Sequence, residues 1–236
     1  MPIKPPDHAD HSPWSKPETV AGFAQSAANQ HLLSFAAERR SRRPSGLALD
    51  IGCGAARNAV PLAQAGWVVI GTDLSWPMLV AAARRAHNDG VASRVRVVRA
   101  AMDAIPARDR TFDMIVAHGI WNLARSSAEF RRAVAEAARV AALGADLFVF
   151  TFSRHTVPDR VEPVAGEPFV FTQFSGEPQC FLTEDQLVSE LEAAGFAPNP
   201  EMPIQELNRR APGLLAGGAA PVIYEGAFRY TGTAAT

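Results

Sequence analysis

The sequence predicts an α/β domain in which a mostly parallel sheet carries helices on both faces. From residue 47 onward, short apolar segments alternate with segments of helical periodicity. A glycine-containing loop follows the first apolar segment, and an acidic residue follows the second, as in sheets that bind a ligand at the carboxyl ends of their strands. With 236 residues, of which 47% are hydrophobic, the chain can form one domain with a substantial core.

The chain before the sheet divides into two parts. Residues 1–17 are rich in Pro, His and Asp, which predicts a loose leader. Residues 18–39 carry a rough apolar stripe, which predicts a single helix.

The strands and helices of the main domain follow in order. Apolar segments predict strands at residues 47–51, 67–72, 95–99, 112–117, 146–152, 169–172 and 222–230. Helices are expected at residues 58–65, from Ser75 toward His87, at 126–142, and from Thr183 to Gly195. Ser75 is expected to cap its helix, and capping boxes are expected at residues 126–129 and 183–186. Gly144 is expected to end the helix before it.

Composition excludes several classes of function. The 23 basic residues balance 24 acidic ones, giving a net charge of −1, so we expect no nucleic-acid partner. Two cysteines are too few for a disulfide framework or a zinc site, and no metal is expected. The only lysines, Lys4 and Lys16, precede the main domain, which argues against lysine-based covalent chemistry. No apolar run reaches the roughly 18 residues of a membrane span, and no secretory signal is evident, so we expect a cytoplasmic protein.

The loop after the first strand is the main candidate for a ligand site. It contains Gly52 and Gly54, which let the backbone approach a ligand, and it opens a helix whose first N–H groups are free. Asp73 follows the second strand, where a carboxylate can accept hydrogen bonds from both ribose hydroxyls. The third glycine of a dinucleotide fingerprint is replaced by Arg57, whose long side chain would crowd a pyrophosphate. A nicotinamide or flavin cofactor is therefore the weaker interpretation.

Residues 50–58, D-I-G-C-G-A-A-R-N, closely resemble motif I of the class I S-adenosylmethionine-dependent methyltransferases. In many small-molecule members that motif reads approximately D-x-G-C-G-x-G-R-N, so Ala56 is the one departure. Residues 71–75 resemble the ribose-binding segment of the family, residues 101–103 the adenine-binding segment, residues 111–116 the fourth strand and residues 191–196 the late helix–strand junction. The resemblance covers residues 46–152 well and 181–230 more loosely.

The resemblance implies a Rossmann-like, doubly wound, mostly parallel seven-stranded sheet. Residues 1–45 would then supply a leader and a helical cap, and residues 46–236 the methyltransferase domain, with a substrate-side insertion at 153–181 after strand five. S-adenosylmethionine would be the cofactor and S-adenosylhomocysteine the product. The cofactor-binding residues implied are Asp50, Gly52, Cys53, Gly54, Arg57, Asn58, Asp73, Leu74, Met78, Met102, Asp103 and Ala117.

Candidates for catalysis follow strands four and five. His118 and His155 lie at neighbouring strand ends, where a histidine near its ordinary pKa can act as a base. His118 could instead only hydrogen-bond the cofactor or a loop carbonyl. The residues expected to contact the acceptor are Trp14, Trp121, Asn122, Arg125, Phe171 and Phe174. Residues 153–181 fit either a lid or a packed extension of the core.

The acceptor is expected to be a small molecule. No Asn-Pro-Pro-Tyr-like segment follows strand four, there is no cysteine cluster, and no Asp-Asp-Asn metal constellation is evident. These absences argue against methylation of nucleic-acid bases, arsenic and catechols, respectively. Two alternatives remain open: a nicotinamide-dependent oxidoreductase and a non-catalytic S-adenosylmethionine-binding protein. The acceptor atom, the pathway and the choice between monomer and homodimer are left open by the sequence.

Overall fold

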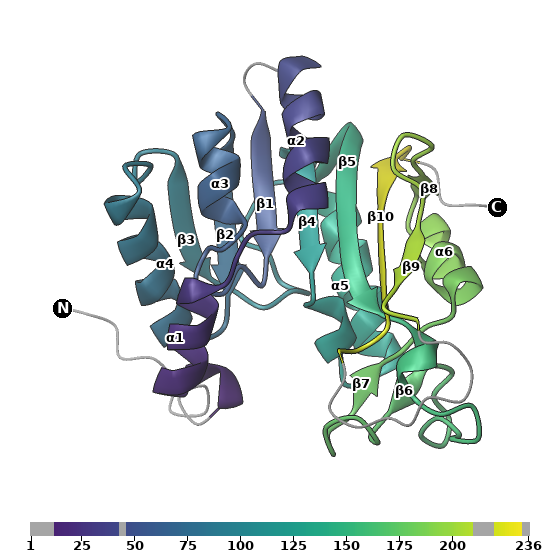
Figure 1. Cartoon of the computed structure of the whole chain (residues 1–236). Coiled ribbons are helices and arrows are strands. Elements are labelled where there is room, and N and C mark those ends of the chain that lie inside the picture. The colour runs from purple at the N-terminus through teal and green to yellow at the C-terminus, as the bar shows by residue number, and fades with distance from the viewer. Residues whose placement is uncertain (1–11, 43–45, 210–219, 233–236) are drawn as a thin grey trace.

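The computed structural model describes residues 12–42, 46–209 and 220–232, and a single large sheet runs through it (Figure 1). The leader at residues 1–11, predicted as part of segment 1–45, lies outside the described residues. The helices are α1 (Pro17–Gln25), α2 (Gln30–Arg42), α3 (Ala59–Gln64), α4 (Trp76–Asn88), α5 (Ser127–Val140) and α6 (Glu184–Ala193). Short 3₁₀ turns are η1 (Pro13–Ser15), η2 (Trp121–Leu123) and η3 (Arg154–Thr156).

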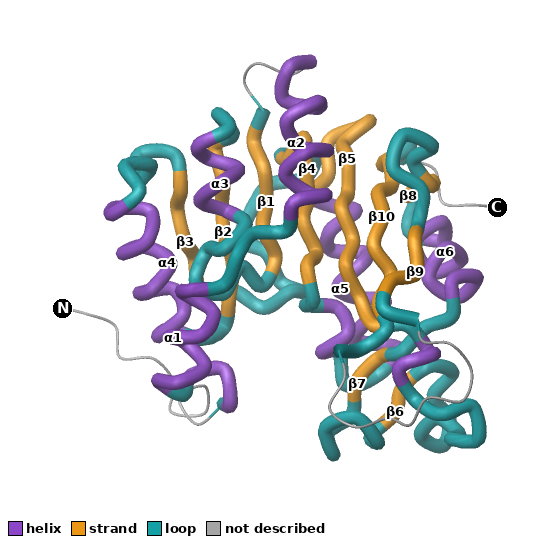
Figure 2. The backbone as a smooth tube through the Cα atoms, in the orientation of Figure 1, coloured by secondary structure: helices purple, strands orange, loops and turns teal. Residues whose placement is uncertain are grey.

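The strands of the large sheet are β1 (Leu47–Ile51), β2 (Val68–Asp73), β3 (Val95–Arg99), β4 (Phe112–His118), β5 (Ala141–Phe152), β8 (Phe196–Pro198), β9 (Gln205–Leu207) and β10 (Ile223–Tyr230). Two further strands, β6 (Val170–Phe171) and β7 (Gln179–Cys180), form a separate antiparallel pair. The order in the large sheet is β3-β2-β1-β4-β5-β10-β8, with β9 also paired to β10 (Figure 2). Strands β1 to β5 are parallel, whereas β10 is antiparallel to its neighbours.

The expected Rossmann-like, doubly wound and mostly parallel sheet is therefore confirmed, but it has eight strands rather than seven. The additional strand arises because the outer edge of β10 is shared. Its last residues pair with β8 and its first residues pair with β9, so two short strands occupy one edge position. The chain between them turns at Asn199, whose N–H donates to the carbonyl of Ala227 in β10.

Helices cover both faces of the sheet, because the strands carry apolar side chains on both. On one face, Leu32 of α2, Leu62 of α3 and Ala82 of α4 are wholly buried against the strands. On the other face, Phe130 of α5 and Leu191 of α6 are equally buried. Burial of this kind contributes about 1.5–3 kcal/mol for each large apolar side chain, so the sheet is anchored from both sides.

The predicted single helix over residues 18–39 is wrong. The chain breaks at Ser26 and starts again as α2 at Gln30, because Asn29 acts as the N-cap of α2. The side-chain oxygen of Asn29 accepts a hydrogen bond from the N–H of Leu32 at 2.9 Å. The break lets α1 and α2 run over different parts of the sheet, as Figure 1 shows.

Two further predictions fail near the fifth strand. Strand β5 begins at Ala141 rather than at residue 146, and Gly144 lies within it instead of ending a helix. At the start of α5, Ser126 caps the N–H of Glu129, but the Glu129 carboxylate accepts from the N–H of Arg125 rather than completing a capping box. The capping box at Thr183 and the Ser75 cap are confirmed.

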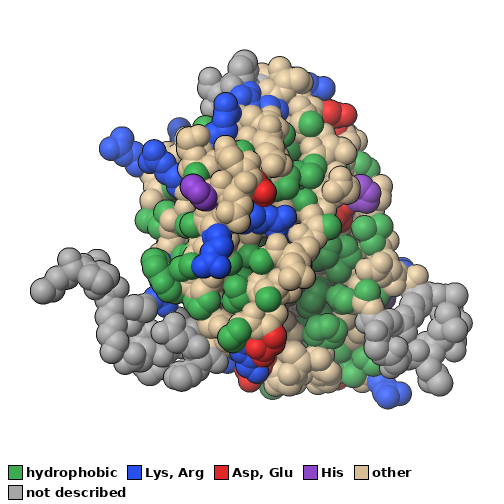
Figure 3. Space-filling model, turned by 60° about the vertical axis from the view of Figure 1, so that its left-hand side comes forward, with side chains coloured by type: hydrophobic (Ala, Val, Ile, Leu, Met, Phe, Trp, Pro, Cys, Tyr) green, Lys and Arg blue, Asp and Glu red, His purple; other side chains and the backbone are tan. Residues whose placement is uncertain are grey.

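Two segments flank the carboxyl edge of the parallel strands. Helix α1, which directly follows Lys16, packs against α4 on one side, and the β6–β7 pair lies on the other (Figure 1). On the side of the molecule turned forward in Figure 3, exposed hydrophobic and basic side chains are interspersed. The two flanking segments are the parts of the chain best placed to enclose a ligand at this edge.

Candidate functional site

The loop after β1 has the conformation that its glycines predict. Gly52 and Gly54 have φ values of +67° and +52°, in the left-handed region. Ala56, which stands where the resembling motif has glycine, also has a positive φ of +61° and is fully buried. A side chain in this region costs about 1–2 kcal/mol, so the loop retains its shape at a small energetic cost.

Asp73, at the end of β2, holds this loop in place. Its Oδ2 accepts a hydrogen bond from the N–H of Gly54 at 3.0 Å, and its Oδ1 accepts one from the N–H of Ser75 at 2.8 Å. Burial raises the pKa of Asp73, while these backbone donors lower it. Behind the loop, the Cys53 sulfur packs so closely on Gly71 that a Cβ there would lie 2.7 Å from it. Burial raises the pKa of the Cys53 thiol, so the thiol is a packing group.

Two charged residues of the loop lack the partners that such groups usually have. Asp50 is 2% exposed, and its Oδ2 has no hydrogen-bond partner among the described residues. Burial raises the pKa of Asp50 to about 7, although the charge of Arg57 opposes this shift. The guanidinium of Arg57 donates to Nδ1 of His118 at 2.8 Å, and it has no other hydrogen bond in the described part of the chain. The free oxygen of Asp50 and the remaining donors of the Arg57 guanidinium can together receive a ligand that carries both charges.

His118, at the end of β4, is held as a neutral ring. It stacks on Phe150 of β5 with ring centroids 4.1 Å apart, and its Nε2 lies 3.3 Å from the side-chain nitrogen of Asn29. Burial, followed by the charge of Arg57, lowers the pKa of His118 to about 3. The ring is therefore uncharged at neutral pH.

Asn29 and Glu225 belong to the same cluster, and sequence analysis missed both. Glu225 of β10 is 4% exposed; its carboxylate accepts hydrogen bonds from the side-chain nitrogen of Asn29 at 2.6 Å and from His31. The backbone N–H of Asn29 donates to the side chain of Asn58, at the end of motif I, at 3.1 Å. Asn29 thus connects the loop after β1, the end of β4 and the middle of β10. A carboxylate in the middle of the mostly apolar segment 222–230 was the available signal.

His155, the second histidine candidate, lies in a separate cluster. Its Nδ1 is 2.6 Å from Glu206 of β9, which also accepts from the buried Ser153 at 2.5 Å. Its Nε2 lies 3.4 Å from the guanidinium of Arg209. Across β9 and β10, Glu206 pairs with Tyr224 and Gln205 pairs with Glu225. Because neighbouring residues of a strand alternate between faces, Glu206 and Glu225 lie on opposite faces of the sheet. The two histidines share no contact residue, so they form two clusters rather than one pair.

The remaining predicted cofactor residues lie in varied surroundings. Met78 is buried beside Gly54, and Ala117 is buried at the end of β4. Leu74 is exposed, and Met102 packs partly against the core. The Asp103 carboxylate is 3.2 Å from the guanidinium of Arg132.

The predicted acceptor residues are dispersed. Trp121 is wholly buried against Phe130, and the neighbouring Asn122 is buried as well. Arg125 is exposed and ion-paired with a glutamate of the insertion. Phe171 and Phe174 both pack on Phe181 within the insertion, and Trp14 of η1 packs on Phe23 of α1. The structure therefore does not gather these residues into one pocket.

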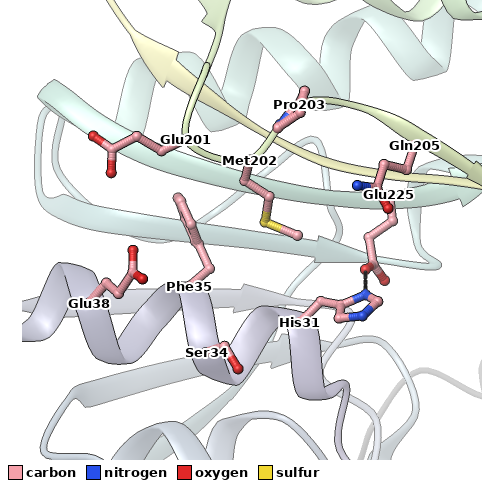
Figure 4. A pocket seen from close by; sticks show the side chains of 9 residues that line it. All are labelled: His31, Ser34, Phe35, Glu38, Glu201, Met202, Pro203, Gln205 and Glu225. Atoms are coloured by element: carbon pink, nitrogen blue, oxygen red, sulfur yellow. Dashed lines mark hydrogen bonds and ion pairs between the residues drawn. The ribbon is translucent and has the colours of Figure 1, made fainter.

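Two adjoining cavities open beside Glu225. One, of about 270 Å³, lies between α2 and the segment before β9, and Figure 4 shows its lining. The other, of about 310 Å³, is lined in part by Asn29, Phe150 and Ile223. His31 and Glu225 line both cavities. Neither cavity touches the Gly52–Gly54 loop, which α1 covers: Phe23 would lie 3.5 Å from a Cβ on Gly54.

The site suits S-adenosylmethionine chemically. Its amino-acid end carries an ammonium and a carboxylate, which match the unpaired Asp50 oxygen and the Arg57 guanidinium. Within the described ranges, no group of three or more His, Cys, Asp or Glu side chains is placed to hold a metal ion. None of the described helices combines the length and apolar character needed to cross a membrane.

Comparison with known proteins agrees with this chemistry. The family described as "Methyltransferase domain" matches residues 48–144. A demethylmenaquinone methyltransferase of Lactiplantibacillus plantarum is 29% identical over 167 residues, which are 63% of this chain and 69% of that protein. Residues 48–144, which the family matches, contain the loop, Asp73 and His118.

Solved structures share the fold. The [4+2]-cyclase SpnF is 25% identical with a TM-score of 0.59 over 75% of this chain, which spans 59% of the cyclase. The 1,6-didemethyltoxoflavin-N1-methyltransferase of Burkholderia thailandensis, solved with its substrate and S-adenosylhomocysteine, is 20% identical with a TM-score of 0.62, over 86% of this chain and 80% of that one. Residues 48–144 therefore form a methyltransferase domain of the class I S-adenosylmethionine-dependent type, and S-adenosylmethionine is the cofactor.

Proposed function

We propose that the protein transfers the methyl group of S-adenosylmethionine to a small-molecule acceptor. The observation that carries this proposal is the free oxygen of buried Asp50 near the Arg57 guanidinium, which makes one hydrogen bond, to His118, beside a left-handed glycine loop tied to Asp73. The cofactor supplies an electrophilic methyl group on a sulfonium. The protein has to bind both molecules, orient them and exclude water.

Each end of the cofactor has residues of suitable chemistry. Arg57 would bind the carboxylate and Asp50 the ammonium, with the backbone of Gly52 to Gly54 lying against this end. A carboxylate has about four acceptor positions, of which Asp73 uses two for Gly54 and Ser75, so two remain for the ribose hydroxyls. Completing the proposed cofactor set are Cys53, Asn58, Leu74, Met78, Met102, Asp103 and Ala117.

The two histidines receive different roles in this proposal. With its pKa lowered to about 3, His118 is a poor base at neutral pH and acts as a positioning residue for Arg57 and Asn29. His155 is exposed and has a carboxylate on Nδ1, so Nε2, which lies 3.4 Å from the Arg209 guanidinium, is the nitrogen that would accept a proton once Arg209 has moved aside. We assign His155 to proton removal where the acceptor requires it.

The enclosing segments keep their predicted roles as proposals. Residues 13–42 would cap the cofactor side, because Phe23 covers the loop and the Arg57 guanidinium lies over its ring at 5.8 Å. The insertion at 153–181 would face the acceptor, and its exposed Phe174 is available for contact. Trp14, Trp121, Asn122, Arg125 and Phe171 remain proposed acceptor-side residues. The protein is proposed to act in the cytoplasm, as a monomer or a homodimer.

Calorimetry with S-adenosylhomocysteine tests the proposed cofactor site. Asp73→Ala should weaken binding at least about tenfold, equivalent to about 1.4 kcal/mol, because the loop tether and the ribose acceptor are lost together. Asp89→Ala is the matched control: this aspartate is the C-cap of α4, and its carboxylate is ion-paired with Arg85, away from the loop after β1. Equal binding by both variants would contradict the proposed site.

Turnover requires a separate measurement. Ligands that co-purify with the protein are identified by mass spectrometry and offered with S-adenosylmethionine, and formation of S-adenosylhomocysteine is followed. Cofactor binding without methylation of any compound in a broad panel would favour a non-catalytic binding protein.

A further inference from the structure

The buried carboxylate of Glu225 lines both cavities and lies in one cross-strand row with His118 of the site. Glu225 is in register with Phe150, and Phe150 is in register with His118, so these three side chains form one row across β10, β5 and β4. The row lies on the face covered by α2. Asn29 spans it, because its side-chain nitrogen contacts both ends.

Glu225 retains hydrogen-bonding capacity. Each of its oxygens has one described partner: Oε2 accepts from Asn29 and Oε1 from His31. A carboxylate has about four acceptor positions, so a ligand in either cavity can donate to the remaining two. Since Asn29 is itself held by Asn58 and Leu32, the carboxylate is presented in one orientation.

The surroundings of Glu225 select the charge of such a ligand. Glu38 and Glu201 also line the cavity of Figure 4, and no lysine or arginine is among its lining residues. Arg39 and Arg42, outside the lining, pair with Glu201, so Glu225 and Glu38 carry the charge preference. His31 is the one basic lining group and is 62% exposed, so water screens it. In the other cavity, Phe150 adds an aromatic wall, which attracts cations through its negative ring face.

We propose that the paired cavities beside Glu225 bind the ammonium group of a small amine with an apolar body, and that this amine is the methyl acceptor or part of it. Phe35 and Met202 provide apolar surface in one cavity, and Ile223 and Leu207 in the other. Their volumes of about 270 and 310 Å³ suit a compact ligand. The ammonium donates to Glu225 as an anchor. Where its nitrogen is the atom methylated, it first gives one proton to this carboxylate, because an ammonium has no lone pair to attack the methyl group, and S-adenosylhomocysteine is the leaving group. The row through Phe150 to His118 connects this anchor to the cofactor loop. This inference rests on the proposed function, since it supplies the acceptor's chemical class.

Two near-isosteric probes test the charge preference. Phenethylamine and 3-phenylpropanoate are titrated by calorimetry into the full-length protein saturated with S-adenosylhomocysteine. We expect phenethylamine to bind at least tenfold more tightly than 3-phenylpropanoate. Equal affinities, tighter binding of the anion or no binding of the amine would overturn the proposal.

Three variants assign the effect to Glu225. Glu225→Gln should weaken phenethylamine binding at least tenfold, whereas Glu192→Gln, an exposed position of α6 that lines neither cavity, should change it less than twofold. If Glu225→Gln does not fold, Gln205→Lys provides the test. Gln205 is exposed, lines the same cavity and pairs with Glu225. The ammonium of the introduced lysine should compete with the amine for Glu225 and weaken phenethylamine binding. Unchanged amine binding in a folded Glu225→Gln protein, or in Gln205→Lys, would overturn the proposal.

Binding of S-adenosylhomocysteine is recorded for every variant. Loss of that binding in the wild type would contradict the proposed function itself. Normal cofactor binding with no amine preference would contradict only the acceptor class.

Discussion

Two buried groups of the site, Asp50 and His118, predict opposite effects of pH on stability. Burial raises the pKa of Asp50 from 3.8 to about 7, against the charge of Arg57. Burial, with Arg57 acting in the same direction, lowers the pKa of His118 from 6.5 to about 3. The perturbations that separate the two effects are Asp50→Asn and His118→Asn, which remove one titrating group each and keep a polar side chain.

The sign of each effect follows from the protons bound on unfolding. Between about pH 4 and 6.5, folded Asp50 keeps a proton that the unfolded chain has lost, so its contribution to the free energy of unfolding falls as pH rises. Over the same range, folded His118 is neutral while the unfolded chain is protonated, so its contribution rises with pH. In the wild type the two contributions nearly cancel.

The magnitude follows from one proton per group. A difference of one bound proton changes the free energy of unfolding by about 1.4 kcal/mol per pH unit. From about pH 4.5 to 6.0, Asp50→Asn should therefore gain up to about 2 kcal/mol of stability, and His118→Asn should lose up to about 2 kcal/mol, both relative to the wild-type profile. The two variants should diverge by up to about 4 kcal/mol across this range.

Urea unfolding followed by circular dichroism, at several pH values and without cofactor, measures these profiles. His87→Asn is the matched control for the substitution itself, because His87 is an exposed histidine of α4 outside the site. Parallel profiles for Asp50→Asn and His118→Asn would refute the assignment of a buried neutral acid and a buried neutral histidine to this site.

Two further predictions concern packing and capping. Gly71→Ala should lower the free energy of unfolding by about 1–3 kcal/mol and weaken S-adenosylhomocysteine binding, because the new Cβ would lie 2.7 Å from the Cys53 sulfur. Adding Cys53→Ala should restore part of the stability and part of the affinity. If neither is restored, that contact is not the cause. Thr183→Ala should cost about 1 kcal/mol in urea unfolding by removing the cap of α6, without altering S-adenosylhomocysteine affinity; a change in affinity would show that α6 communicates with the site.

Local parts of the site were predictable from the sequence. The loop of Gly52 and Gly54 follows directly from its chain neighbours, and Asp73 reaches it because β1 and β2 are adjacent parallel strands. Parallel strands bring their carboxyl ends together, so the position of His118 at the same edge was also predictable. These features depend on short segments and on one rule of sheet topology.

Long-range parts of the site were not predictable. Asn29 and Glu225 are 196 positions apart, and their contact requires both the break between α1 and α2 and the insertion of β10 beside β5. The alanine-rich segment around Asn29 has high helix propensity, which concealed an N-cap. The side of the sheet that Glu225 faces depends on the register of an antiparallel strand, and a shift of one residue would reverse it.

The same dependence on register explains the edge of the sheet. Strand β10 is long enough to pair with two short partners, β8 and β9, and both lack the length or periodicity that identifies a strand. The extension of β5 back to Ala141 was hidden by Gly144, which also resembles a helix end.

The position of Lys16 immediately before α1 has a practical consequence for labelling. Since the chain has only two lysines, both ahead of α1, lysine side chains place a fluorophore on that end of the protein and leave the arginine-rich body unmodified. Helix α1 carries Phe23 over the cofactor loop, so a dye at Lys16 becomes a reporter of whether that helix moves when a ligand enters. The same scarcity confines lysine-based surface immobilisation to Lys4 and Lys16.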